Sequence, residues 1–173
     1  MTLPMSRRQA GEILAMGVQK HSDPQAAKTL AKAIGYNDSP LFGAEKKRTR
    51  LVAELVMLNT ALTVFAINQV IEMPDAKTVI DYFLDFAKRS MFSVIAPKDP
   101  AFHKSYESRM AQYFAILSAD KPILGLSFAF LKNLGIDPLS NIQSQMVAGK
   151  LIADTLSKGI AVLRTISLAP NGA

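Results

Sequence analysis

The longest apolar stretch of the chain runs from Leu51 to Ile71, and its seventeen residues from Leu55 to Ile71 carry no charge. Apolar side chains occupy every helical phase of this stretch rather than one stripe, which is typical of a helix that is buried on nearly all sides. We therefore predict a central core helix over about residues 44–72. Leu55, Leu58, Leu62, Phe65 and Ile67 are expected to be almost fully buried in it.

A membrane span is the alternative interpretation, because seventeen uncharged residues approach the ~20 that a transmembrane helix needs. Glu54 and Glu72 bracket the stretch, Asn59, Asn68 and Gln69 interrupt it, and no aromatic belt flanks it. Polar groups are costly inside a bilayer. A core helix is favoured, and the chain is predicted not to be an integral membrane protein.

The other apolar patterns also have helical spacing, and local signals mark their ends. Ser6 is a good N-cap, Pro24 and Pro74 fit helix boundaries, and Gly35 and Gly135 fit helix C-termini. The predicted helices cover residues 6–19, 24–34, 44–72, 75–95, 102–117, 123–134 and 138–168. In the last helix, Ile142, Met146, Gly149, Ile152, Ala153, Leu156, Ile160 and Leu163 are expected to face inward. The fold class is therefore all-α, a single domain of residues 1–173 built as a bundle of about seven helices.

Residue matches recur at an offset of one hundred positions. Lys32 and Gly35 match Lys132 and Gly135, and Ala61 matches Ala161. This spacing indicates either an internal duplication of a unit of helix, short helix and long helix, with the helix at 75–95 joining the two copies, or chance similarity between apolar helices. If it is a duplication, residues 24–71 should superimpose on residues 122–168.

Composition bounds the function only loosely. Twenty Lys and Arg against fourteen Asp and Glu give a net charge of +6, and these charges are spread along the chain. The chain has no cysteine, so disulfides and thiolate chemistry are excluded. Arg7 and Arg8 are not followed by an apolar run, which disfavours a secretory signal and makes the cytoplasm the expected location.

Candidate chemistry is sparse, because the sequence contains only two histidines. His103 stands four residues before Glu107, but two side chains do not make a metal site. No phosphate-binding loop, nucleophile elbow or Ser/His/Asp set is recognisable. We therefore predict no metal, no cofactor and no catalytic residue, and a protein that is not an enzyme.

Four cations, Lys46, Lys47, Arg48 and Arg50, open the predicted central helix. They are either the solvated first turns of that helix, with Arg50 and Glu54 as an i,i+4 pair, or an anion-binding cluster. A sequence-specific DNA reader is disfavoured, because a core helix rather than a polar recognition helix follows the preceding turn.

Asn59, Thr63 and Asn68 are polar residues within the apolar stretch. They are either core groups whose hydrogen bonds are satisfied or polar anchors for an apolar small molecule held between the two long helices. This small-molecule binder or sensor is the second functional hypothesis.

The predicted helix at 123–134 is apolar around its whole circumference, which a short helix seldom buries against its own chain. Ile123, Leu126, Phe128 and Phe130 are therefore candidates for a homo-oligomer interface. The first functional hypothesis is a non-enzymatic helical interaction module that self-associates. Anion or nucleic-acid binding through the basic cluster is the third.

Overall fold

The computed structural model describes residues 4–36, 44–95 and 102–169, apart from the side chains of Ala44 and His103. Residues 37–43 and 96–101, which lie in gaps between the predicted helices, and the side chain of His103 are outside this description.

Seven helices of ten residues or more make up the described fold, and the predicted all-α class is confirmed. They are α1 (Arg7–His21), α2 (Pro24–Ala33), α3 (Ala44–Val70), α4 (Asp75–Ala87), α6 (Phe102–Leu117), α7 (Pro122–Leu134) and α8 (Ile142–Thr165). Helix α4 continues into a π-helical turn, η1 (Lys88–Phe92), and a last short turn, α5 (Ser93–Ile95). The two ends of the chain meet through a parallel backbone bridge between Met5 and Leu168.

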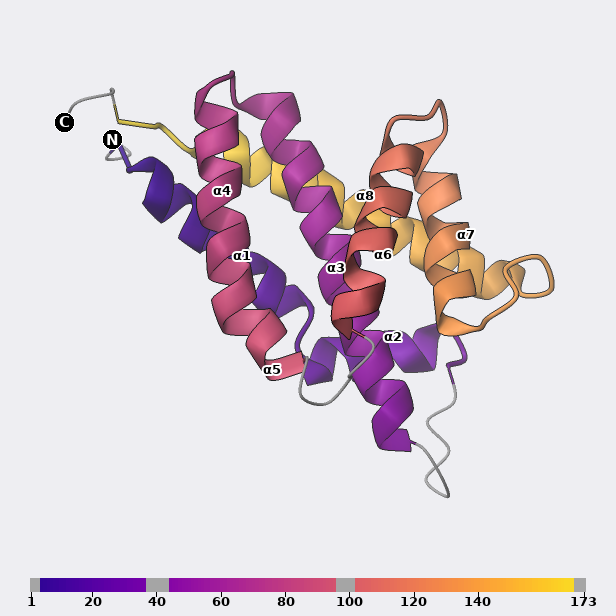
Figure 1. Cartoon of the computed structure of the whole chain (residues 1–173). Helices are drawn as coiled ribbons and strands as arrows, with labels where there is room; N and C mark the ends of the chain where they lie inside the picture. Colours follow the sequence, from indigo (N-terminus) through magenta and orange to yellow (C-terminus); the bar gives the residue numbers. More distant parts are fainter. Residues whose placement is uncertain (1–3, 37–43, 96–101, 170–173) are drawn as a thin grey trace.

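Helix α3 is the centre of the bundle, as predicted, and packs against α1, α2, α4, α6, α7 and α8. In Figure 1, α8 passes behind it from the side of α7 to the side of the two chain ends. Leu55, Leu58, Leu62 and Ile67 are buried, which confirms the prediction for these four. Phe65 is only partly buried, because the last turns of α3 are covered on fewer sides than its middle.

Helix α3 is long and apolar enough to cross a membrane by length and composition alone. In the fold, however, 78% of its apolar window is buried against the other helices. Its apolarity therefore has a sufficient explanation in the core of the bundle.

Local signals account for the helix ends. Ser6 and Gln9 form a reciprocal capping box at α1, and Asp23 Oδ1 accepts from Ala26 N at 2.7 Å to cap α2. Gly35 and Gly135 both have positive φ, 65° and 81°, the backbone conformation that glycine adopts most easily.

The inward face predicted for the last helix is wrong in its first half. Ile142 and Met146 are exposed, and the buried face there is instead formed by Ser144, Ala148 and Ile152. Small residues let α8 approach its neighbours closely, and Ser144 Oγ donates to the carbonyl oxygen of Ile34 at 2.7 Å. The helix also begins at Ile142 rather than at Pro138, with Asn141 Oδ1 accepting from Ser144 N.

The hundred-residue offset reappears in the backbone at the ends of α2 and α7. Tyr36 N donates to Ala31 O at 2.8 Å, and Ile136 N donates to Leu131 O at 2.9 Å. The pairs from Gly35 N to Lys32 O and from Gly135 N to Lys132 O correspond in the same way. The two short helices therefore end in the same hydrogen-bonded motif, while the duplication of the whole unit stays a prediction.

Candidate functional site

Two adjoining cavities follow the side of the bundle where α1 and α2 face α8 across α3. Their volumes are about 480 Å³ and 400 Å³. Both cavities are lined by His21, Asn59, Leu151, Asp154 and Thr155, so they form one continuous depression, which we call the α1–α8 groove. The groove opens between α1 and α2 on one side and α8 on the other, and the two long helices of the small-molecule hypothesis both line it, because α3 contributes Asn59 and Thr63 to its inner wall.

The half of the groove beside α1 has mainly apolar walls. Ile13, Leu14 and Val18 line it from α1, and Leu151 and Val162 line it from α8. Ile13 and Val162 are 43% and 47% exposed, so both walls present apolar surface to solvent. A partly open apolar trough with a few polar groups is the usual character of a small-molecule site.

Asn59 lines both halves of the groove and is the main polar group of its inner wall. The residue is only 3% exposed, and its Nδ2 donates to Ser22 Oγ at 2.9 Å. Its Oδ1 is buried and has no hydrogen-bond partner among the described residues. An unpaired buried acceptor costs about 1–3 kcal/mol. The inner wall of the groove therefore has an acceptor that a hydrogen-bond donor would stabilise.

The other two predicted anchors behave differently from Asn59. Thr63 lines the half beside α1, but its Oγ1 already donates to the backbone oxygen of Asn59 at 2.8 Å. Asn68 is exposed and is not part of either groove cavity. It directly follows the buried Ile67 but faces solvent, so its assignment as an anchor is not supported by its position.

Sequence reasoning missed the polar mouth of the groove. His21 closes α1, and Asp154 and Lys158 project from α8, more than one hundred residues further along the chain. Lys150 and Asp23 add further charge in the half beside α2. The groove therefore has an apolar half and a polar half, which suits an amphipathic ligand.

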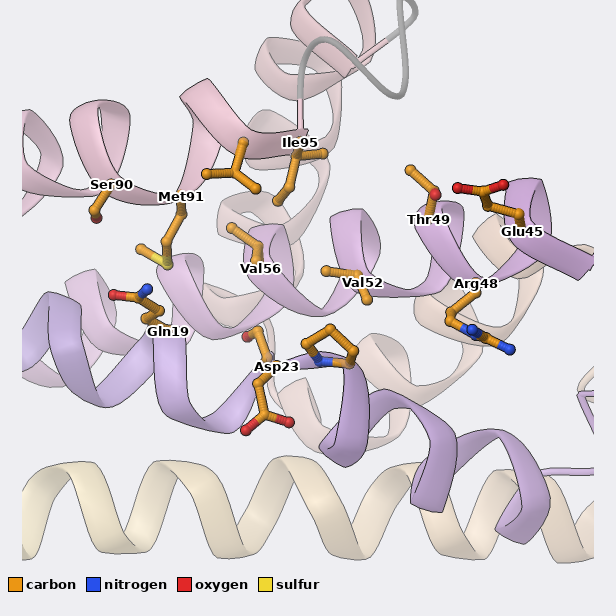
Figure 2. Close-up of a pocket in the computed structure, with 13 residues that line it drawn as sticks. Gln19, Asp23, Glu45, Arg48, Thr49, Val52, Val56, Ser90, Met91 and Ile95 are labelled. Carbon is orange, nitrogen blue, oxygen red and sulfur yellow. The ribbon is translucent and has the colours of Figure 1, made fainter.

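A third cavity of about 370 Å³ lies on another side of α3, and we call it the α3–α5 pocket. Figure 2 shows Val52 and Val56 of α3 facing Met91 of η1 and Ile95 of α5. Ser22 and Asp23, in the α1–α2 turn, also line this pocket. The hydrogen bond between Ser22 and Asn59 joins a residue of this pocket to a residue of the groove, and Asp23 lines both.

The four cations of the basic cluster are exposed but do not act as one group. Lys46, Lys47 and Arg50 line a cavity of about 410 Å³ beside the ends of α2 and α7, whereas Arg48 lines the α3–α5 pocket. Arg50 donates to the carbonyl oxygen of Asn133 near the end of α7. Cations stabilise helix C-termini, so this placement gives the cluster a structural purpose. Anion binding stays a prediction.

Glu54 is buried in a polar network that joins α3, α6 and α7, a position that the sequence did not reveal. Its Oε1 accepts from Tyr113 Oη and, at 2.7 Å, from Asn133 Nδ2, and its Oε2 lies 3.7 Å from Arg109 Nε. Burial and the adjacent Glu54 carboxylate raise the pKa of the Tyr113 hydroxyl. Tyr113 therefore stays a proton donor. We assign this network to the core, where it fixes three helices together.

The predicted interface on α7 is largely internal. Leu126 and Phe130 are completely buried within the monomer, and Phe128 is half-buried. Leu126 and Phe130 are thus core residues, because α3, α6 and α8 enclose the last two turns of α7. Of the four predicted residues, only Ile123 is exposed, and Leu124 beside it is exposed as well.

Among the described residues, no group of three or more His, Cys, Asp or Glu side chains is placed to hold a metal ion. No protein-family model matches the chain, and neither a curated protein nor a solved structure shows significant similarity to it. The functional argument therefore depends on the geometry of this chain alone.

Proposed function

We propose that this protein binds a small amphipathic molecule in the α1–α8 groove. The apolar part of the ligand lies against α1 and α8, and a hydroxyl or amine group donates to Asn59 Oδ1. The observation that carries the proposal is the unpartnered, buried oxygen of Asn59 on the inner wall of an apolar trough. A ligand donor at this point would satisfy an acceptor that has no partner within the described part of the chain.

Gly17 offers a direct test, because it lines the groove and a Cβ atom added there meets nothing within 4 Å. Gly17→Phe should place a ring in the apolar half without disturbing the packing. Gly149→Phe is the matched control, since Gly149 also has open space around it and, although it belongs to α8, lines neither cavity of the groove.

The probe is 1-decanol, with decane as its apolar counterpart, and binding is measured by calorimetry. Wild-type protein and Gly149→Phe should bind decanol equally, and Gly17→Phe should bind it at least tenfold more weakly. Asn59→Leu should remove the preference for decanol over decane, because the leucine offers no acceptor. Failure of decanol to saturate the wild type, or equal binding by Gly17→Phe, would refute the proposal.

A second proposal, self-association, is supported by a different surface from the one that the sequence indicated. Leu139, Ile142 and Met146 are 77%, 68% and 72% exposed; Ile142 and Met146 lie one turn apart on the same face of α8, and Leu139 shortly precedes the helix. Large apolar side chains gathered on one surface are a frequent mark of protein–protein contacts. A second copy of the chain could cover this surface through a two-fold symmetric contact.

Sedimentation velocity at micromolar concentration tests self-association. The wild type should sediment as a dimer, and the double variant Ile142→Asp with Met146→Asp should sediment as a folded monomer. Met73→Asp is the control, because Met73 is similarly exposed but lies at the start of α4. A monomeric wild type refutes this second proposal.

A further inference from the structure

The α3–α5 pocket has an apolar interior and one buried polar group. Val52, Val56, Met91 and Ile95 form apolar walls from two sides, as Figure 2 shows. The polar group is Ser22, which lines the pocket although only 3% of its surface is exposed.

The Ser22 hydroxyl has hydrogen-bonding capacity to spare. Its Oγ accepts from Asn59 Nδ2, and no described residue accepts its proton in turn. A serine hydroxyl can donate one hydrogen bond and accept two. Accepting a bond from an amide polarises the hydroxyl and strengthens it as a donor. Ser22 is therefore a buried donor at an apolar pocket.

Ser90 provides an internal comparison, because it lines the same pocket from η1 but has no donor to spare. Its Oγ donates to the carbonyl oxygen of Phe86 at 2.8 Å. The π-helical turn that carries Ser90 and Met91 is an uncommon element, and such turns frequently occur at functional sites.

The charged residues around the pocket have both signs. Arg48 contributes a cation, while Glu45 and Asp23 contribute anions, and Asp23 is already engaged as the N-cap of α2. The rim therefore carries charges of both signs, and the apolar interior favours a neutral group.

We propose that the α3–α5 pocket is a second binding site, specific for a small, neutral, apolar molecule that carries a carbonyl oxygen, which accepts the hydrogen bond of Ser22. The hydrocarbon part of the ligand packs against Val52, Val56, Met91 and Ile95. This site is distinct from the groove, where the inner wall presents an acceptor rather than a donor. The pocket should therefore bind ligands that accept a hydrogen bond, whereas the groove should bind ligands that donate one.

The probe for this site is 2-octanone, and octane is the matched ligand without an acceptor. Methyl resonances of ¹³C-labelled protein identify the site, because the methyl groups of Met91 and Ile95 line the pocket and those of Ile13 and Val162 line the groove. Titration with 2-octanone should shift Met91 and Ile95 saturably, with a dissociation constant at least fivefold lower than that for octane. Perturbation of Ile13 and Val162 alone, or equal binding of the two ligands, would overturn the proposal.

Variants separate the hydrogen bond from the shape of the pocket. Ser22→Ala should remove the preference for 2-octanone over octane, Ser22→Thr should keep it because a hydroxyl remains, and Ser90→Ala should leave it unchanged. A preference that survives in Ser22→Ala, or disappears in Ser90→Ala, contradicts the assignment of the donor. Should Ser22→Ala fail to fold, the comparison of the two ligands on the wild type still decides the proposal. Decanol binding in the groove is read from different methyl groups, so each site can fail without the other.

Discussion

Helix α1 faces α4 on one side and the groove toward α8 on the other, and a glycine stands on each side. A Cβ atom at Gly11 would lie 2.7 Å from Phe83 N and 2.9 Å from Tyr82 Cβ, so α1 and α4 are in backbone contact there. A Cβ atom at Gly17, six residues along the same helix, would meet nothing within 4 Å. The same residue type thus permits close helix packing on one side and leaves space on the other.

The contrast shows which part of the fold holds the molecule together and which part is available for function. Well-packed helix contacts have no room for a ligand, and changes of even one methylene group affect their stability. Cavities contribute little to stability, and their linings tolerate substitution more easily. We therefore expect the contact between α1 and α4 to contribute to the stability of the fold and the groove between α1 and α8 to bind the ligand.

The largest effect should come from removing the buried ring of Phe83, the residue whose backbone nitrogen lies against Gly11. Phe83 is fully buried, and Phe83→Ala should lower the free energy of unfolding by about 3–5 kcal/mol. Val162→Ala is the counterpart in the groove, and because Val162 is about half exposed the loss should stay below about 1 kcal/mol. Urea unfolding measures the stability of both variants. If they lost the same free energy of unfolding, the contrast between the α4 side and the groove side of α1 would be contradicted.

Filling the close contact should have the next largest effect. Gly11→Ala introduces a methyl group against the backbone of α4, which cannot give way as a flexible side chain can. Overpacking of this kind costs about 1–3 kcal/mol, which exceeds the gain in helix propensity. Urea unfolding should therefore show a net destabilisation; a more stable Gly11→Ala protein would show that α1 and α4 are packed less closely than described.

On the groove side of α1, the corresponding variant Gly17→Ala should raise the free energy of unfolding, whereas Gly11→Ala lowers it. Alanine is favoured over glycine within a helix by up to about 1 kcal/mol, and at Gly17 no contact opposes it. Gly149→Ala in α8 should give a similar gain for the same reason. Thermal unfolding measures the stability of both variants. If Gly149→Ala is stabilised and Gly17→Ala is not, a contact at Gly17 opposes the added methyl group, and the prediction is wrong.

Features with local causes could be predicted from the sequence. Ser6, Pro24, Gly35 and Gly135 act on their own helix ends, so their signals are complete within a few residues. The central position of α3 was also predictable, because a helix with apolar residues at every phase must be covered on every side.

Features set by distant partners could not be predicted in the same way. The sequence suggested Glu54 as an exposed partner of Arg50, whereas its partners Tyr113 and Asn133 lie 59 and 79 residues away. In α8, the apolar pattern favoured Ile142 for the buried face, but Ser144 takes that place because the carbonyl oxygen of Ile34, just after α2, accepts from its hydroxyl. Tertiary contacts decided both cases.

The residues of the candidate site also differ in whether the sequence could reveal them. Asn59 could be recognised as a polar residue in an apolar run, and the structure places it at the groove. Its companions His21 and Asp154 could not, because an exposed histidine at a helix end and an exposed aspartate on a helix give no signal until the fold brings them to one groove.

The smallest effect concerns the ion pair at the far end of the contact between α1 and α4. Arg7 Nε and Nη2 donate to the two carboxylate oxygens of Asp75 at 2.8 Å and 2.9 Å, and Arg7 Nη1 donates to Ala169 O at 3.0 Å. The side-chain hydrogen bond from Arg7 lowers the pKa of Asp75 below its usual value. A carboxyl whose pKa is lower in the folded chain stabilises the fold above its unfolded pKa, and this stabilisation disappears as the pH falls through the folded pKa.

Asp75→Asn should therefore lower stability slightly at neutral pH and should make the loss of stability in acid less steep. The effect is small because the pair is partly exposed and screened by solvent. Asp85→Asn is the control, since the pair of Asp85 with Arg89 lies within one exposed turn and joins no two helices. Urea unfolding between pH 3 and pH 7 would contradict the role of Asp75 if the two variants had the same pH dependence. It would then follow that α1 is held against α4 by the close packing at Gly11 and Phe83 alone, with no measurable contribution from the chain ends that Arg7 connects.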